Sequence, residues 1–152
     1  MNYEIVSLKE KTTAGVSGRT NNQSPDMGTV IGGLWNKFFQ EGIYDSIPNK
    51  KNRKSLGIYA DYEKDEKGDY TVMAACEIEH LKNCHPGIVT KTIPAGKYAK
   101  FVVKGNIAQA IGEFWMNLWE MNLSRSFICD FEEYQDKEKG QEEIHIYIGL
   151  VE

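Results

Sequence analysis

The sequence lacks the features of membrane and secreted proteins. No apolar run approaches the roughly 20 residues that a membrane-spanning helix needs. The first residues, Met1 to Glu4, contain neither the basic region nor the apolar segment of a secretory signal. The three cysteines, Cys76, Cys84 and Cys129, have no disulfide, metal or redox spacing, so we expect free thiols. Together these absences predict a cytoplasmic protein without membrane contact.

Motifs of cofactor-dependent and hydrolytic enzymes are also missing. The chain has no phosphate-binding loop, dinucleotide-binding turn, nucleophile elbow or paired-histidine zinc motif. The densest group of metal-ligating residues is His80, Cys84 and His85. No second group supplies the other ligands of a closed site, and a polar loop explains the stretch equally well. We therefore expect neither a cofactor nor a bound metal.

Positive charge is in slight deficit. The 18 Lys and Arg residues against 22 Asp and Glu residues give a formal net charge of −4, which removes the usual electrostatic argument for nucleic-acid binding. The basic run from Asn49 to Lys54 is short and typical of a solvated loop. Because a repeated pattern occupies both halves of the chain, no length remains for a helix-turn-helix domain. We therefore expect no direct contact with nucleic acid.

The composition is that of one globular domain. A chain of 152 residues that is 41% apolar can bury a core and still hold a ligand pocket, so we expect a single domain over residues 1–152. Alternating hydrophobicity predicts strands at about 3–10, 14–17, 56–62, 70–78, 88–93, 98–103, 127–134 and 144–151. Apolar residues at three- and four-residue steps predict two helices, from Ser24 to about Gln40 and from Asn106 to about Asn122.

The predicted elements repeat along the chain. The segment 62–68 matches 134–140 at an offset of 72, with Tyr, Glu, Lys and Gly identical. The two units, about 1–80 and 86–152, share the order strand, strand, helix, strand, strand. Such units bury their sheet faces against helices and each other. The pattern therefore predicts an α+β domain with pseudo-twofold symmetry and a central ligand cleft.

The strand at 127–134 holds the main candidate for chemistry. Alternation along a strand places Phe127, Cys129 and Phe131 on one face, which we expect to pack on a helix. Asp130 and Glu132 then point to the opposite face, toward solvent or a cleft. A buried carboxylate there would have a raised pKa or tyrosine donors nearby.

Six large aromatic rings are the second candidate feature. They are either ordinary core or the walls of a cleft. Rings that surround a carboxylate form a receptor for flat, apolar cations, because ring faces attract positive charge and the acid neutralises it. The six residues are Trp35, Tyr59, Tyr98, Trp115, Trp119 and Tyr147.

Five short segments carry a family resemblance. They are Leu34-Trp-Asn-Lys-Phe38, Leu56-Gly-Ile-Tyr59, Ile93-Pro-Ala-Gly-Lys-Tyr-Ala99, Phe131-Glu-Glu-Tyr134 and Ile144-His-Ile-Tyr-Ile148. With them the sequence resembles, from Tyr3 to Val151, the GyrI-like small-molecule-binding domain, which is the effector-binding domain of AraC-type and multidrug-responsive bacterial transcription regulators. The chain departs from the family at Gly149, where many members have proline.

The resemblance implies a fold, a site and an activity. The fold is a duplicated strand-helix-strand-strand arrangement with a ligand cleft between the halves. Glu132 would be the acidic pocket residue that meets cationic aromatic ligands, and Trp35 would be the tryptophan of the first helix. No DNA-binding domain accompanies the matched region, so a stand-alone binding protein is expected rather than a direct activator of transcription.

Three functions are compatible with these observations. The favoured one is binding of an amphipathic small molecule, cationic or aromatic, with Glu132 supplying charge and the six rings supplying surface. The first alternative is a hydrolase of strained electrophilic small molecules, in which Glu132 would act with a second acid, Glu113 or Glu77. The second alternative is a protein-docking module such as a gyrase inhibitor.

Overall fold

The computed structural model describes residues 2–65, 67–80, 87–135 and 142–151. Cys84 and His85 of the candidate metal cluster lie outside the described residues, as does most of the turn 134–140 that carries the second copy of the repeat. Within the described ranges, no helix combines the length and the apolar composition that crossing a membrane requires.

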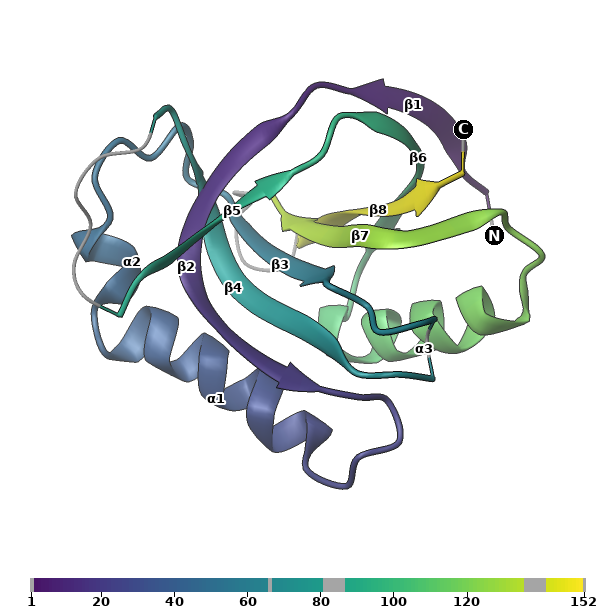
Figure 1. The fold of residues 1–152 in the computed structure, drawn as a ribbon, viewed down its shortest axis with the longest axis horizontal. Helices are drawn as coiled ribbons and strands as arrows, with labels where there is room; N and C mark the ends of the chain where they lie inside the picture. The colour runs from purple at the N-terminus through teal and green to yellow at the C-terminus, as the bar shows by residue number, and fades with distance from the viewer. Residues whose placement is uncertain (1, 66, 81–86, 136–141, 152) are drawn as a thin grey trace.

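The chain forms an α+β fold around one antiparallel sheet of eight strands (Figure 1). The strands are β1 (Glu4–Leu8), β2 (Lys11–Thr20), β3 (Ser55–Ala60), β4 (Tyr70–Ile78), β5 (Val89–Ile93), β6 (Gly96–Lys104), β7 (Arg125–Tyr134) and β8 (Glu143–Leu150). The helices are α1 (Met27–Gln40), the short α2 (Ile43–Ser46) and α3 (Ile107–Glu120). The predicted α+β class is therefore confirmed.

The strands and both long helices form where the hydrophobic period places them, with ends that differ by a few residues. The helix α3 begins as predicted, because the Asn106 side chain caps it by accepting a hydrogen bond from the Gln109 backbone N–H. The helix α1 begins later than predicted, since Asp26 and not Ser24 precedes its first residue. The short helix α2 was not predicted, because its four residues are fewer than periodicity can reveal.

The strand order follows from antiparallel pairing of the predicted hairpins. Across the sheet the order is β1-β6-β8-β7-β3-β4-β2-β5. If each strand of the first half is exchanged with its counterpart in the second, the same order is read in reverse. The two halves meet where β3 pairs with β7, with Gly57 opposite Glu132. The order in which the strands are connected is thus the same in the two halves. That the halves are duplicated units related by a pseudo-twofold axis stays a prediction.

Both long helices pack on the same face of the sheet (Figure 1). Phe38 of α1 lies in one buried cluster with Ala14 and Ala74, on the strands β2 and β4. Phe114 of α3 lies in another with Phe101 of β6 and Ile146 of β8. The units therefore share one continuous sheet and do not pack sheet face against sheet face.

The opposite face of the sheet holds a third cluster that contains no helix. Ile58, Met73, Phe131 and Tyr147 are buried there, and partly buried side chains of the edge strand β1 pack against them. The expectation that Phe131 faces a helix is therefore wrong. The sheet curls strongly enough that strands cover its apolar inner face, so Glu132, on the other side of β7, is the residue that faces the helices.

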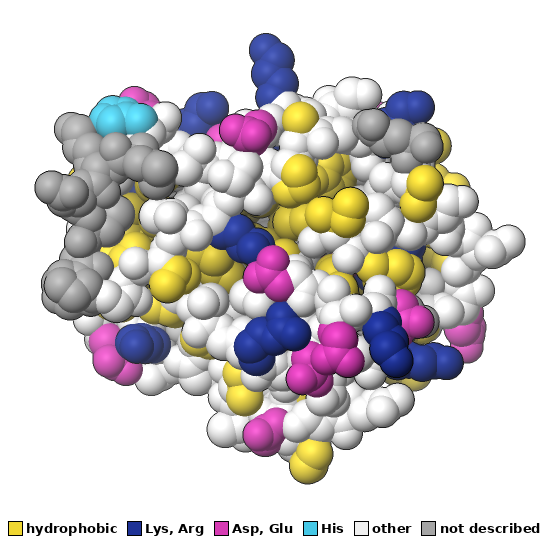
Figure 2. Space-filling view, in the orientation of Figure 1, with side chains coloured by type: hydrophobic (Ala, Val, Ile, Leu, Met, Phe, Trp, Pro, Cys, Tyr) yellow, Lys and Arg dark blue, Asp and Glu magenta, His cyan; other side chains and the backbone are white. Residues whose placement is uncertain are grey.

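Charged side chains are intermixed on the molecular face that Figure 2 presents. Lys and Arg lie among Asp and Glu there, and apolar side chains gather near the centre. Over the described part of that face there is no broad field of one charge sign.

The tightest backbone approach in the sheet generates a stability prediction. At Gly15 on β2, an added Cβ would lie 2.0 Å from the Ala74 carbonyl oxygen. We expect Gly15→Ala to lower the free energy of unfolding by about 2–3 kcal/mol in urea titrations, as overpacking of a close contact does. Gly18→Ala on the same strand is the control, because its nearest atom would be Val30 Cγ1 at 3.5 Å. Equal stability of the two variants would contradict the prediction.

Candidate functional site

A cavity of about 730 Å³ lies on the helix-bearing face of the sheet. The helix α1 packs on β2 and β4, and the helix α3 packs on β6 and β8, so the central strands β3 and β7 are left uncovered between them. The volume suits a drug-sized molecule. Seven aromatic residues line the cavity: Trp35, Tyr59, Tyr62, Tyr70, Trp115, Trp119 and Tyr134.

Glycine at position 57 keeps the floor of the cavity open. An added Cβ there would lie 2.9 Å from Glu132 Oε1 and 3.3 Å from the Trp35 ring. The missing side chain lets the carboxylate and the indole approach the β3 backbone closely. The segment Leu56-Gly57-Ile58-Tyr59 therefore contributes both a gap and a ring to the site.

Glu132 is the one acidic residue among the described residues that line the cavity. It is only 2% exposed. Its carboxylate accepts hydrogen bonds from Tyr59 Oη at 3.1 Å, from Trp115 Nε1 at 2.9 Å and from Tyr134 Oη at 2.9 Å. These donors come from β3, α3 and β7. No lysine, arginine or histidine of the described chain forms an ion pair with it.

Burial controls the protonation of this cluster. Burial raises the pKa of Glu132 above its ordinary value, although the three hydrogen bonds act in the opposite direction. Burial and the nearby carboxylate raise the pKa of Tyr59 and of Tyr134 as well. Both phenols therefore stay protonated at neutral pH and serve as donors to the acid.

The rings around the acid have fixed relative orientations. Tyr59 and Trp115 meet edge to face with centroids 5.3 Å apart, and Trp35 meets Tyr134 in the same way at 5.3 Å. Trp119 is 48% exposed and lies at the cavity surface. Such an array offers apolar area and ring faces that attract a cation.

A second acid, Asp130, lies two residues from Glu132, and its carboxylate is held by hydrogen bonds within the protein. Asp130 is completely buried and accepts hydrogen bonds from Arg125 Nη2 at 2.8 Å, Tyr62 Oη at 2.5 Å and the Gly149 backbone N–H at 2.8 Å. The two acids that alternation placed on one face thus have different environments. Asp130 has a cationic partner, and Glu132 does not.

The structure brings together five of the seven residues that the sequence indicated. Glu132, Trp35, Tyr59, Trp115 and Trp119 all line the cavity. Tyr98 and Tyr147 do not, because they lie on the inner face of the sheet.

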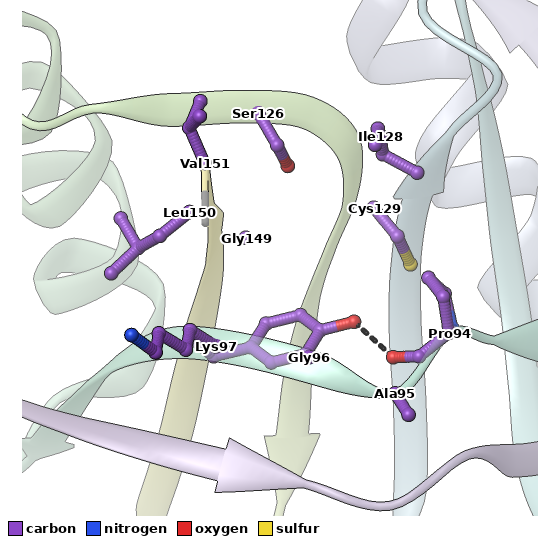
Figure 3. A pocket seen from close by; sticks show the side chains of 11 residues that line it. Pro94, Ala95, Gly96, Lys97, Ser126, Ile128, Cys129, Gly149, Leu150 and Val151 are labelled. Carbon is purple, nitrogen blue, oxygen red and sulfur yellow. Dashed lines mark hydrogen bonds between the residues drawn. The ribbon is translucent and has the colours of Figure 1, made fainter.

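The two tyrosines outside the cavity have other contacts. Tyr147 stacks on Phe131 with centroids 4.6 Å apart. Tyr98 borders a separate hollow of about 360 Å³, where its hydroxyl donates to the Pro94 carbonyl at 2.6 Å (Figure 3). Alternation explains both positions, since Tyr147 is one residue from Ile146 and Ile148, and Tyr98 is one residue from Ala99, all in the cluster that faces α3.

Sequence reasoning missed five polar residues of the cavity, which are Asn22, Tyr62, Tyr70, Arg125 and Tyr134. Tyr134 shares the strand face of Glu132, and Tyr62 matches Tyr134 in the repeat, so both carried a detectable signal. Arg125 had no such signal in the sequence, because the pairing of β7 with β8 shifts register between Arg125 and Asp130 and so breaks the alternation along β7.

The acids considered as partners for hydrolysis lie elsewhere. Glu113 is exposed on α3 and accepts a hydrogen bond from Gln109. Glu77 is 7% exposed and forms ion pairs with Lys11 and Lys51. Neither lines the cavity.

The sequence pattern of the Cass2 family, described as integron-associated effector binding protein, matches residues 4–150. The chain belongs to this family. The GyrI-like resemblance is thereby confirmed for nearly the whole chain. A relative of this chain is protein YobU of Bacillus subtilis (strain 168), which carries the name of a transcriptional regulator. It is 27% identical over 154 residues, and the match covers 96% of each protein.

Two solved structures share the fold of this Cass2 family member. One is the integron cassette protein VCH_CASS2 from the mobile metagenome of Vibrio cholerae, with a TM-score of 0.76, 22% identity, and coverage of 98% of this chain and 95% of the other. The other is SAV2435 bound to tetraphenylphosphonium, with a TM-score of 0.76, 21% identity, and coverage of 97% and 94%.

The hydrogen bonds to the acid generate a prediction about its protonation. Tyr134→Phe removes a donor that stabilises the ionised form of Glu132, so the pKa of Glu132 should rise further. Titration of the glutamate side-chain carbons by ¹³C NMR measures this. Tyr98→Phe is the control, since its hydroxyl binds Pro94 on the other face. An unchanged Glu132 titration in Tyr134→Phe would refute the role given to this bond.

Proposed function

We propose that this chain binds an amphipathic, cationic aromatic small molecule in the cavity between α1 and α3, as an effector-binding protein linked to transcription regulation. The observation that carries the proposal is Glu132, a buried carboxylate among aromatic rings that has three neutral donors and no cationic partner in the described chain. A ligand of this class would complete the site.

Electrostatics favours a cation over other ligands at this position. A buried acid without a counter-charge is unfavourable in its ionised form, and the raised pKa of Glu132 expresses that cost. A bound cation would offset the cost, and ring faces such as those of Trp35 and Trp115 would add cation–π attraction. The apolar walls would bury the rest of the molecule.

The comparisons support the class of ligand. SAV2435 was solved with tetraphenylphosphonium, a positively charged centre that carries four phenyl rings, and it has the fold described for this chain. The family description names effector binding, and the Bacillus relative is named as a regulator of transcription. We extend the same kind of ligand to the Glu132 cavity, and we retain the cytoplasm as the expected location.

The geometry favours binding over hydrolysis. The hydrolase alternative assigns two acids to the reaction, one to activate water and one to protonate the leaving group. Glu132 is the only carboxylate of the described residues that line the cavity, since Asp130 lies beneath the surface and is bound to Arg125. Binding is therefore the function we propose for this site.

The first prediction of this proposal concerns charge. Methyltriphenylphosphonium should bind in the wild-type cavity, and Glu132→Gln should weaken that binding at least about tenfold, or about 1.4 kcal/mol, because the counter-charge is lost. Triphenylphosphine oxide is a neutral compound with the same rings, so Glu132→Gln should lower its affinity much less than it lowers that of the phosphonium. Isothermal titration calorimetry measures both.

Glu133→Gln is the matched control for this experiment. Glu133 is the neighbouring glutamate and is only 8% exposed. Its carboxylate forms an ion pair with Lys54 at 3.5 Å, and it does not line the cavity. It should retain wild-type affinity for the phosphonium. If Glu132→Gln also retains that affinity, Glu132 is not the counter-ion.

The second prediction concerns pH. Because the pKa of Glu132 is raised above 4.5, phosphonium affinity should fall as the pH is lowered through that raised pKa, where the acid becomes neutral. Binding should release protons in the same window, since the cation favours the ionised acid. Calorimetry in buffers of different ionisation enthalpy detects this release. A pH-independent affinity from pH 8 down to pH 4.5 would contradict the assignment.

The same shift fixes the sign of a stability effect in the unliganded protein. Between 4.5 and the raised pKa, the folded state retains a proton at Glu132 that the unfolded chain has released. The contribution of Glu132 to the free energy of unfolding therefore falls as the pH rises through this window. Bound phosphonium should offset that loss.

A further inference from the structure

The ligand cavity has a second polar feature, the side chain of Arg125 at the start of β7. Arg125 lines the cavity with Glu132, yet its side chain is only 8% exposed. Buried guanidinium groups normally have several hydrogen-bond acceptors, because they carry five N–H donors. The contacts of Arg125 therefore indicate what the site still requires.

Arg125 is held rigidly by two neighbours. Its Nη2 donates to Asp130 Oδ2 at 2.8 Å, and its guanidinium lies over the Phe127 ring, 4.3 Å from the centroid. Asp130 is itself fixed by Tyr62 and by the Gly149 backbone N–H. The guanidinium is therefore preorganised and has little freedom to seek other acceptors.

Donor capacity remains on this guanidinium. Arg125 Nε is buried and has no hydrogen-bond partner. In the described part of the chain, Asp130 is the only side-chain acceptor bonded to Arg125. A buried donor without an acceptor is unfavourable, and a ligand atom that accepts from the Arg125 guanidinium, which lines the cavity, would supply an acceptor.

Charge determines which kind of acceptor fits. Arg125 and Asp130 form a buried pair with no net charge. An anionic group would meet the negative Asp130 and the nearby Glu132, so a neutral oxygen such as a carbonyl or an ether is favoured over a carboxylate. Asp130, which holds Arg125, is two residues from Glu132 on the same strand face, so the backbone positions of the two acids lie roughly 7 Å apart along β7.

We propose that Arg125 forms a hydrogen-bond donor subsite of this cavity, so that the preferred ligand is an organic cation that also carries a neutral carbonyl or ether oxygen, set apart from its charge. The inference rests on the proposed function, because Glu132 must receive the cationic end. Arg125 then favours cations that carry such an oxygen over cations without one, which the aromatic rings alone would bind with equal affinity.

A matched pair of probes tests the subsite. Pentyltriphenylphosphonium and its (4-oxopentyl) analogue have the same charge, rings and chain length and differ in one carbonyl oxygen. Calorimetry should show that the wild-type protein binds the ketone roughly tenfold more tightly than the alkyl probe, as expected for a hydrogen bond from a charged donor. The readout is the ratio of the two dissociation constants, so general changes of the cavity cancel.

Arg125→Lys isolates the donors in question. Lysine retains a positive charge for Asp130 but has no Nε–H in the guanidinium position, so the ratio should fall to about one. Arg19→Lys is the control, because Arg19 is an exposed arginine bonded to Asp61 and Thr71 outside the cavity. Its ratio should equal that of the wild type.

A direct measurement covers the case in which Arg125→Lys does not fold. In the wild-type protein, the ¹⁵N NMR signal of Arg125 Nε–H should shift with the ketone probe well beyond its shift with the alkyl probe. Equal affinities of the two probes, a preference retained in Arg125→Lys, or equal shifts of this signal would overturn the subsite. In any of these three cases, if both probes still bind and their binding still requires Glu132, only the subsite has failed. If neither probe binds, the proposed function has failed with it.

Discussion

The hydrogen bonds to the Glu132 carboxylate are the interaction around which this site is organised. Tyr59, Trp115 and Tyr134 converge on it from β3, α3 and β7. A buried acid without these donors would be costly, so the contacts stabilise the carboxylate and fix the three rings at once. The same contacts tie the helix α3 to the central strands, where the cavity lies.

The shape of the sheet makes room for that arrangement. Because the sheet curls, its inner face is filled by strand residues such as Ile58, Phe131 and Tyr147, and needs no helix. The two long helices can then both lie on the other face, α1 over β2 and β4 and α3 over β6 and β8. The central pair β3 and β7 is left without a helix above it, and a cavity lined by rings occupies the space.

The two acids on this face of β7, Asp130 and Glu132, have opposite environments. Asp130 is neutralised by Arg125 and saturated by two further donors, which makes it a structural anchor. Glu132 has only neutral donors, which leaves it receptive to a positive charge from outside the chain. Strand alternation gives both residues the same face, yet their partners arrive from distant segments such as Tyr62 and Tyr59. Local sequence therefore could not separate an anchor from a binding group.

The sequence by itself determined the elements and their order. Period and cap signals such as Asn106 predicted both long helices and all eight strands, because these depend on neighbours within a few residues. It also separated Glu132 from Phe131, since alternation is a local property. Only the tertiary structure decided that Phe131 faces inward and that Tyr147 leaves the site. Those outcomes depend on how far the sheet curls and which surface covers each face, which is set by contacts between residues far apart in the chain.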